Sequence, residues 1–250
     1  MNISNLFGSG FSTSWKSHFS SSPAASESVK ELSPLALAVQ MADKRIQTEV
    51  DTNTAQLSSF GKLKSSVSDV QIAAKALIDL SGNDSSAAVK NAVSNLVSAF
   101  NASADIAKTT AALPGATDAS QSAHRVGRDL HRAVSGDASI SDALKDIGVR
   151  LHEGGLALDP KRLDAALTAD PDRVRAVLAE IGQQIHATTS TELEANGNVF
   201  DSLNSLSQLA RVLESQQSAL QSAAQATSTA QSNRANGGRL AAYQSAMNSL

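Results

Sequence analysis

The sequence predicts a mainly α-helical protein, an elongated antiparallel helical bundle or coiled coil formed by long N- and C-terminal helices. A small β-hairpin with short helices is expected near residues 141–181. Alanine, the best helix former, accounts for 42 of the 250 residues, and serine for 38. Only about 60 hydrophobic residues are larger than alanine and 3% of all residues are aromatic, which disfavours one broad core, a β-sandwich or a barrel. The large apolar residues recur at intervals of three and four, as in amphipathic helices.

Residues 1–32 are rich in serine and other small residues, and we expect them to form a disordered leader in the free monomer. Phe7, Phe11, Trp15 and Phe19 recur every four residues, which would place their rings on one face of a helix. The alternative is therefore an amphipathic segment that becomes ordered on assembly.

Residues 33–112 are predicted to form a helical hairpin. Ser33 and Pro34 are a typical N-cap and first helical residue, and the first helix is expected to continue to Leu80. A turn at residues 82–84 separates it from a second helix at about 85–112, which the short connection would fold back antiparallel. The contact residues expected in the two helices are Ile46, Val50, Leu57, Phe60, Leu63, Val67, Val70, Ala74 and Leu77, and Val89, Val93, Leu96, Phe100, Ser103 and Ala107. Asn53 fills the gap in the first series, where one polar residue can fix the register of a coiled coil.

Residues 113–182 are predicted to form a small mixed region. After Pro114 and Gly115, a third helix at about 118–134 carries Ala123, Val126, Leu130 and Val134. One or two helical turns at 141–147 should precede a β-hairpin at 149–158 with glycines in its turn. Asp159–Pro160 and Asp170–Pro171 are each expected to begin a helix, with aspartate as N-cap and proline at the first helical position. The second of these helices carries Val174, Val177, Leu178 and Ile181.

Residues 183–250 are predicted to form a C-terminal coil with a flexible tail. A long helix at about 196–232 should end before Gly237–Gly238, which are expected to break it. Its contact residues alternate steps of three and four and include Leu203, Leu206, Ala210, Leu213, Gln217 and Leu220. Beyond the glycines, Leu240, Tyr243, Met247 and Leu250 would share one helical face and pack in an assembled oligomer.

Composition and charge argue against a catalytic or nucleic-acid-binding protein. The net charge is −3, so no strong attraction to nucleic acid or anionic lipid is expected. No apolar run approaches the roughly 18 residues of a membrane span, so no membrane insertion is expected. Zero cysteine removes disulfides, thiolate catalysis and cysteine-based zinc sites. No basic residue precedes Lys16, and no apolar core follows, so we expect no cleavable signal peptide.

The remaining titratable residues suggest no catalytic or metal site. His124 and His131 are seven residues apart and surrounded by arginines, which would repel a metal cation. The basic patch from His124 to Arg132 is interpreted as a solvated helix face, with an acidic partner as the alternative. The aspartates near residues 159–172 are explained as helix caps and early-helix acids. We therefore expect no enzyme, no cofactor and no bound metal.

The run from Ile140 to Gly182 resembles the C-terminal region of a known family, the bacterial flagellar filament-capping proteins, also called hook-associated protein 2. The resemblance lies in an ordered series of small-residue turns, alternating leucines and capped helices. The matching positions are Leu144, Ile147, Gly148, Val149, Gly155, Leu156, Leu158, Asp159, Leu163, Ala166, Leu167, Asp170, Pro171 and Val174. Where the family often closes with Leu-Phe, this chain has Val177–Leu178.

Two weaker similarities extend the resemblance to about 200 of the 250 residues. The N-terminal helix, with its Ser-Phe-Gly-Lys-Leu step at residues 59–63, looks like the family's N-terminal coil. The late serine- and glutamine-rich helix looks like its C-terminal coil. One departure is large, because family members usually carry β-rich domains between the N-terminal coil and the hairpin region, whereas only residues 81–84 join the first two helices here.

The resemblance implies a non-enzymatic structural protein at the distal end of the bacterial flagellum, exported unfolded without a cleavable signal and located outside the cell. Its implied partners are further copies of itself, flagellin, the hook–filament junction proteins and a flagellar export chaperone. Without the middle domains the chain resembles a minimal cap, a paralogue that plugs or joins axial structures, or a truncated relative. The alternatives are a type III secreted coiled-coil filament or translocator-like protein, and a cytoplasmic helical adaptor or chaperone.

Overall fold

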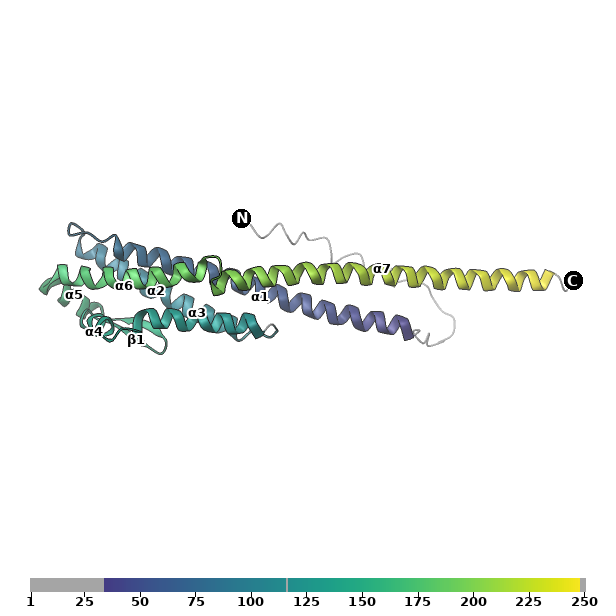
Figure 1. The fold of residues 1–250 in the computed structure, drawn as a ribbon, viewed down its shortest axis with the longest axis horizontal. Helices are drawn as coiled ribbons and strands as arrows, with labels where there is room; N and C mark the ends of the chain where they lie inside the picture. The colour runs from purple at the N-terminus through teal and green to yellow at the C-terminus, as the bar shows by residue number, and fades with distance from the viewer. Residues whose placement is uncertain (1–33, 116, 248–250) are drawn as a thin grey trace.

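A computed structural model describes residues 34–115 and 117–247 as an elongated, mainly helical molecule (Figure 1). We call residues 58–197 the head, and residues 34–57 together with 198–247 the stalk. The elements in chain order are α1 (Pro34–Ile78), α2 (Ser86–Ala111), α3 (Thr117–Ser135), α4 (Ala138–Asp146), β1 (Val149–His152), β2 (Gly155–Leu158), α5 (Pro160–Ala169), α6 (Pro171–Leu193) and α7 (Asn198–Met247). This architecture confirms the predicted fold class. Within the described residues, no helix has the length and apolar character needed to span a membrane.

The core of the head forms where the C-terminal half of α1 packs between α2 and α6. The contact residues predicted for this half of α1 are all fully buried, and those predicted for α2 and α3 are buried as well. They are Phe60, Leu63, Val67, Val70, Ala74 and Leu77 of α1, Val89, Val93, Leu96, Phe100, Ser103 and Ala107 of α2, and Ala123, Val126, Leu130 and Val134 of α3. Hydrogen bonds from Ser66 to Ser103 and between Ser59 and Thr110 show that α1 and α2 are antiparallel, as predicted.

The connection between α1 and α2 is short, and every residue of it is described. It contains no β-rich domain, in agreement with the sequence. The Asp84 carboxylate accepts hydrogen bonds from the Ser81 backbone N–H at 2.7 Å and the Ser81 hydroxyl at 3.0 Å. The backbone hydrogen bond, followed by the hydroxyl, lowers the pKa of Asp84. Ser85 then caps α2 by accepting from the Ala88 N–H.

The predicted hairpin and helix caps are present. β1 pairs antiparallel with β2, with Val149 opposite Leu158 and His152 opposite Gly155. Asp159 caps α5 and Asp170 caps α6, each followed by proline in the first turn. The hairpin and short helices form a side layer on the head, next to α2 and α3.

α6 continues to Leu193, well beyond the last contact residue predicted for it, Ile181, so residue 182 lies inside a helix. The reason is close packing. A Cβ placed on Gly182 would lie 2.8 Å from the Ala74 carbonyl oxygen and 3.2 Å from the Leu77 Cβ. The glycine therefore lets α6 approach α1 rather than ending the helix.

The predicted break at Gly237–Gly238 is wrong, because α7 runs without interruption from Asn198 to Met247. Each glycine in a helix costs about 1 kcal/mol relative to alanine, and no proline or turn-forming cluster follows to end the helix. The expectations for the leader, Ser33 and Leu250 fall outside the described residues, as do the side chains of Tyr243 and Met247.

Candidate functional site

The stalk is an antiparallel pair formed by the N-terminal half of α1 and α7 (Figure 1). The Asn53 side chain donates to the Leu206 carbonyl oxygen at 3.1 Å, and Gln217 Nε2 donates to Gln47 Oε1 at 3.2 Å. The residue that comes earlier in α1 lies against the residue that comes later in α7, so the two helices are antiparallel, and these pairs define their register. Leu206 and Leu213 are buried in this seam.

The predicted interface residues differ widely in burial along the stalk. Leu206 and Leu213 are buried, and Ile46, Val50, Leu57, Leu203 and Leu220 are half-buried. Leu240 is 64% exposed. The seam between α1 and α7 therefore becomes thinner with distance from the head, as its residues change from leucine to alanine, glutamine and serine.

The last part of α7 extends beyond α1 (Figure 1). Since Gln47 lies against Gln217, the register places Pro34, the first residue of α1, opposite about residue 230. The remaining helix to Met247 is roughly 25 Å long at 1.5 Å per residue. Among the described residues, no other element runs alongside this end (Figure 1).

The residues of the motif from Leu144 to Val174 form a packing unit. Its apolar members are buried or half-buried in the head: Leu144, Ile147, Val149, Leu156, Leu163, Leu167 and Val174 are buried, and Leu158 and Ala166 are half-buried. Gly148 has φ +91°, and its carbonyl oxygen accepts from the Asp159 N–H at 2.7 Å, which closes the hairpin onto α5. The motif therefore specifies a local fold.

Sequence reasoning missed the residue that anchors the hairpin to the bundle, Asn101 of α2. Its Nδ2 donates to the Leu156 carbonyl oxygen at 2.9 Å, and its Oδ1 accepts from the Leu156 N–H at 2.7 Å. It thus occupies both backbone groups of Leu156. A polar residue beside the buried Phe100 gives no signal of this role in one sequence.

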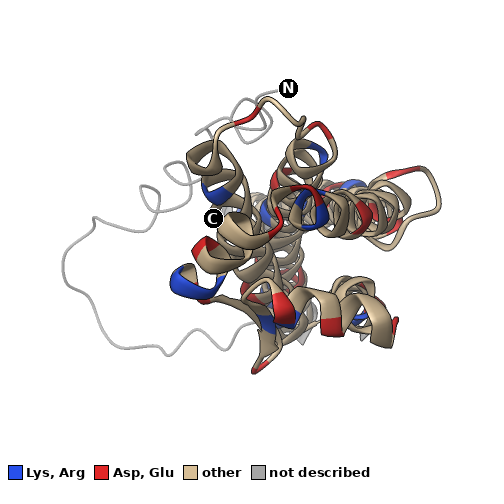
Figure 2. Cartoon of the chain, turned by 90° about the vertical axis from the view of Figure 1, so that its left-hand side faces the viewer, with Lys and Arg blue, Asp and Glu red and all other residues tan. Residues whose placement is uncertain are grey.

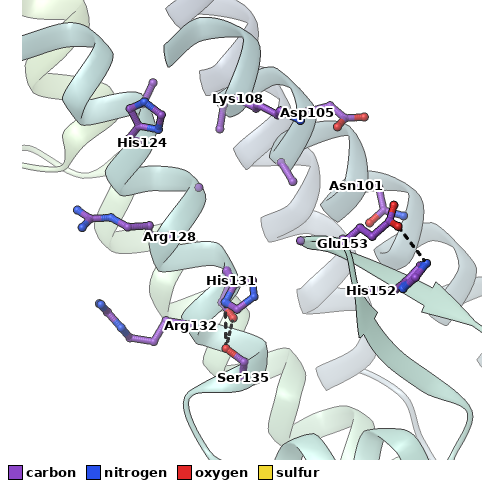
Figure 3. Close-up of a pocket in the computed structure, with 16 residues that line it drawn as sticks. Asn101, Asp105, Lys108, His124, Arg128, His131, Arg132, Ser135, His152 and Glu153 are labelled. Atoms are coloured by element: carbon purple, nitrogen blue, oxygen red, sulfur yellow. Dashed lines mark hydrogen bonds and ion pairs between the residues drawn. The ribbon is translucent and has the colours of Figure 1, made fainter. Parts of the chain in front are cut away.

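A groove of about 740 Å³ lies between α2, α3 and the hairpin turn (Figure 3). Its walls carry His124, His131, His152, Lys108 and Arg128 together with Asp105 and Glu153, while small residues such as Ala107 and Gly127 also line it. Lys108 and Arg128 are positively charged and Asp105 and Glu153 negatively charged, so the groove carries both signs of charge. His152 lies 3.8 Å from Glu153, and His131 forms a hydrogen bond with Ser135. Within the described residues no group of three or more potential metal ligands occurs.

Charges of both signs are also interspersed over the end of the head (Figure 2). The basic side chains between His124 and Arg132 are exposed, and one of the arginines has an acidic partner. Arg132 pairs with Asp129 at 3.0 Å, and Arg125 donates to Asn198 at 3.4 Å. Within the described residues, the geometry of this patch offers a surface for helix packing.

The family model described as flagellar hook-associated protein 2 C-terminus matches residues 69–236. The chain belongs to the flagellar hook-associated protein 2 family. No curated protein and no solved structure matches it.

The match with the hook-associated protein 2 family begins within α1 and continues into the stalk part of α7, so it includes the whole Leu144–Val174 motif. Residues 33–68, including the Ser-Phe-Gly-Lys-Leu step, lie outside it. Members of the hook-associated protein 2 family are structural proteins of the flagellum, an assembly exposed outside the cell, and their partners include proteins of the filament.

Proposed function

We propose that this protein caps the distal end of the flagellar filament or hook, oligomerises through its stalk and assists the assembly of flagellin. The observation that supports this most strongly is the family match over residues 69–236, combined with a helical stalk whose end has no partner among the described residues. Capping requires a subunit that binds copies of itself and the axial structure below. Exposed helix faces on a projecting stalk suit that kind of contact.

Export and assembly follow from the same proposal. The chain would travel unfolded through the flagellar type III channel with an export chaperone, and then fold at the tip beside flagellin and the hook–filament junction proteins. It has no cysteine that could crosslink it on the way. A stalk held by alanine-rich contacts is weak in isolation and gains stability when subunits assemble.

Gene deletion tests the proposal. Loss of the protein should abolish swimming and release unpolymerised flagellin into the medium, because filament subunits would no longer be retained at the tip. Complementation with the wild-type gene should restore both phenotypes, and Leu213→Asp should restore them poorly because it disrupts the stalk. The exposed neighbour provides a matched control, since Glu214→Ala should complement fully.

Other outcomes would point elsewhere. Normal motility and filaments in the deletion strain would contradict a capping role and favour a type III secreted coiled coil outside the flagellum. Protein found only in the cytosol of a flagellated culture would favour a helical adaptor. A compact, protease-resistant monomer spanning residues 1–250 would argue against a stalk that orders on assembly.

A further inference from the structure

The groove between α2, α3 and the hairpin turn has a floor of small side chains. Ala104 and Ala107 of α2 line it together with Ala123 and Gly127 of α3. The two helices approach closely here, since a Cβ placed on Gly127 would lie 3.6 Å from the Ala107 Cβ. Among the described residues only α2, α3 and the hairpin turn line the groove, so no described helix fills its 740 Å³. A floor of small residues between two neighbouring helices leaves room for a third helix, with its side-chain ridges in their groove.

The length of the groove suits a short stretch of helix. Along α3 the lining residues extend from His124 to Ser135, which is about 16 Å at 1.5 Å per residue. The hairpin turn lies at one end of the groove, near Asn101 of α2 (Figure 3). One helical turn rises about 5.4 Å, so the groove accepts about three turns of a partner helix.

The side of the groove formed by α3, which we call the α3 rim, is basic. Its charged or titratable residues are His124, Arg128, His131 and Arg132, and no described carboxylate lines the groove from this helix. Arg128 and Arg132 extend from the side of α3 that faces away from α2, so they flank the groove and leave its floor open (Figure 3). Charged residues in this position contact the flank of a helix that lies on the floor, as they do beside the seam of a coiled coil.

The α3 rim has positive charge to offer a partner. Among the described residues Arg128 takes part in no ion pair or hydrogen bond. Arg132 pairs with Asp129 at 3.0 Å, but its side chain is 72% exposed, and exposed ion pairs contribute little to stability. Carboxylates of a partner can therefore bind Arg128 directly and share Arg132 with Asp129.

The opposite side of the groove is mixed in charge. It carries Lys108 and Asp105 of α2 and, at the hairpin turn, Glu153 beside His152. Asp105 extends from α2 on the side that faces away from α3 (Figure 3). The two carboxylates that line the groove thus lie across from the α3 rim, and a negatively charged flank of a partner helix is attracted to α3 more than to α2.

We propose that this groove is a docking site for a helix of a partner protein that carries carboxylates along one flank. The helix lies on the small-residue floor, and its acidic flank follows the α3 rim, where Arg128 and Arg132 bind it. A helix with lysines on this flank is repelled, so the rim selects the partner by charge. The site is separate from the stalk, and its occupation is a property additional to capping.

Binding of a synthetic helical peptide to the full chain tests the docking site. The probe has alanines on one face and glutamates on one flank, and a second peptide has lysines in place of the glutamates. Because the net charge of the chain is −3, attraction to the molecule as a whole would favour the lysine peptide. We expect the opposite order in fluorescence anisotropy: saturable binding of the glutamate peptide that weakens with salt, and several-fold weaker binding of the lysine peptide.

Nuclear magnetic resonance locates the bound peptide without any variant. The backbone amides of Gly127, Gly154 and Gly155, which line the groove, should shift as the glutamate peptide is added. Equal affinity for the two peptides, shifts that leave these glycines unchanged, or no binding at millimolar peptide would each overturn the proposal.

Charge reversal then tests the α3 rim. Arg128→Glu changes an exposed side chain and should weaken binding of the glutamate peptide several-fold while strengthening that of the lysine peptide. The matched control is Lys64→Glu, which makes the same change of charge at an exposed position of α1 outside the groove and should leave both affinities unchanged. An equal loss of binding in the two variants would refute the site. The deletion phenotypes do not involve the peptides, so they test capping separately.

Discussion

Leu213 offers the most direct test of how the stalk is held together. It is 2% exposed in the seam between α7 and α1. Leu213→Ala removes three carbon atoms from this contact, worth about 2.4 kcal/mol at about 0.8 kcal/mol per methylene group. The cavity left in a closed core would add to this cost, but two paired helices can move together and fill part of it. We therefore expect a loss of about 2–3 kcal/mol in the free energy of stalk pairing.

Leu213→Asp should cost more, because it also places an ionised carboxylate in an apolar contact. The free-energy cost of Leu213→Asp cannot exceed the cost of opening the stalk, because opening returns the carboxylate to water. The cysteine-free sequence allows a clean assay: Gln47→Cys and Gln217→Cys place two thiols at side chains that bond at 3.2 Å. Crosslinking by a short bis-maleimide should be several-fold slower with Leu213→Asp and intermediate with Leu213→Ala.

The matched control is Glu214→Ala, which changes the exposed neighbouring residue. An exposed substitution of this kind should alter stability by less than about 0.5 kcal/mol and leave crosslinking at the wild-type rate. Equal melting temperatures and equal crosslinking rates for Leu213→Asp and Glu214→Ala would refute the assignment of Leu213 to the seam.

Three further substitutions test the hairpin anchor, a backbone constraint and the register of the stalk. Asn101→Ala leaves both backbone groups of Leu156 without their partner and should lower the free energy of unfolding by about 1–3 kcal/mol in urea titrations, unlike Asn95→Ala on the exposed side of α2. Gly148→Ala forces a φ of +91° on alanine and should cost about 1–3 kcal/mol, whereas Gly61→Ala, with open space in a helix, should raise the melting temperature. Asn53→Leu removes a buried amide whose Oδ1 has no partner among the described residues, so it should raise the melting temperature while allowing thiol crosslinks in registers shifted by a heptad.

The first three helices could be predicted because their local signals agree with their packing. In α2, for example, Ser85 caps the helix and a series of apolar residues from Val89 to Ala107 lies on the side that is buried. The caps at Asp159 and Asp170 could be predicted for the same reason. An aspartate followed by proline can accept hydrogen bonds from the free N–H groups of the first helical turn, whatever the rest of the fold. These features depend on residues close together in the sequence.

The features missed from the sequence depend on contacts between distant residues. Gly182 has the local appearance of a helix end, and only the approach of Ala74 shows that it allows two helices to touch. Asn101 is an ordinary polar residue until folding brings it to Leu156. At Gly237–Gly238 the local signal for a break was outweighed by the helix-forming residues around it.

The distribution of large side chains connects this fold to assembly. The fully buried Phe60, Phe100 and Leu130 are in the head, whereas the buried apolar residues of the described stalk are smaller, namely Val199, Leu206 and Leu213, and are joined by polar bonds such as that between Asn53 and Leu206. Isolated helices shorter than about 12–15 residues are marginal in water, and the end of α7 beyond residue 230 is of about that length and includes two glycines. Among the described residues no element covers this end, so its stability should increase most through contacts with other subunits, where the exposed Leu240 can be covered.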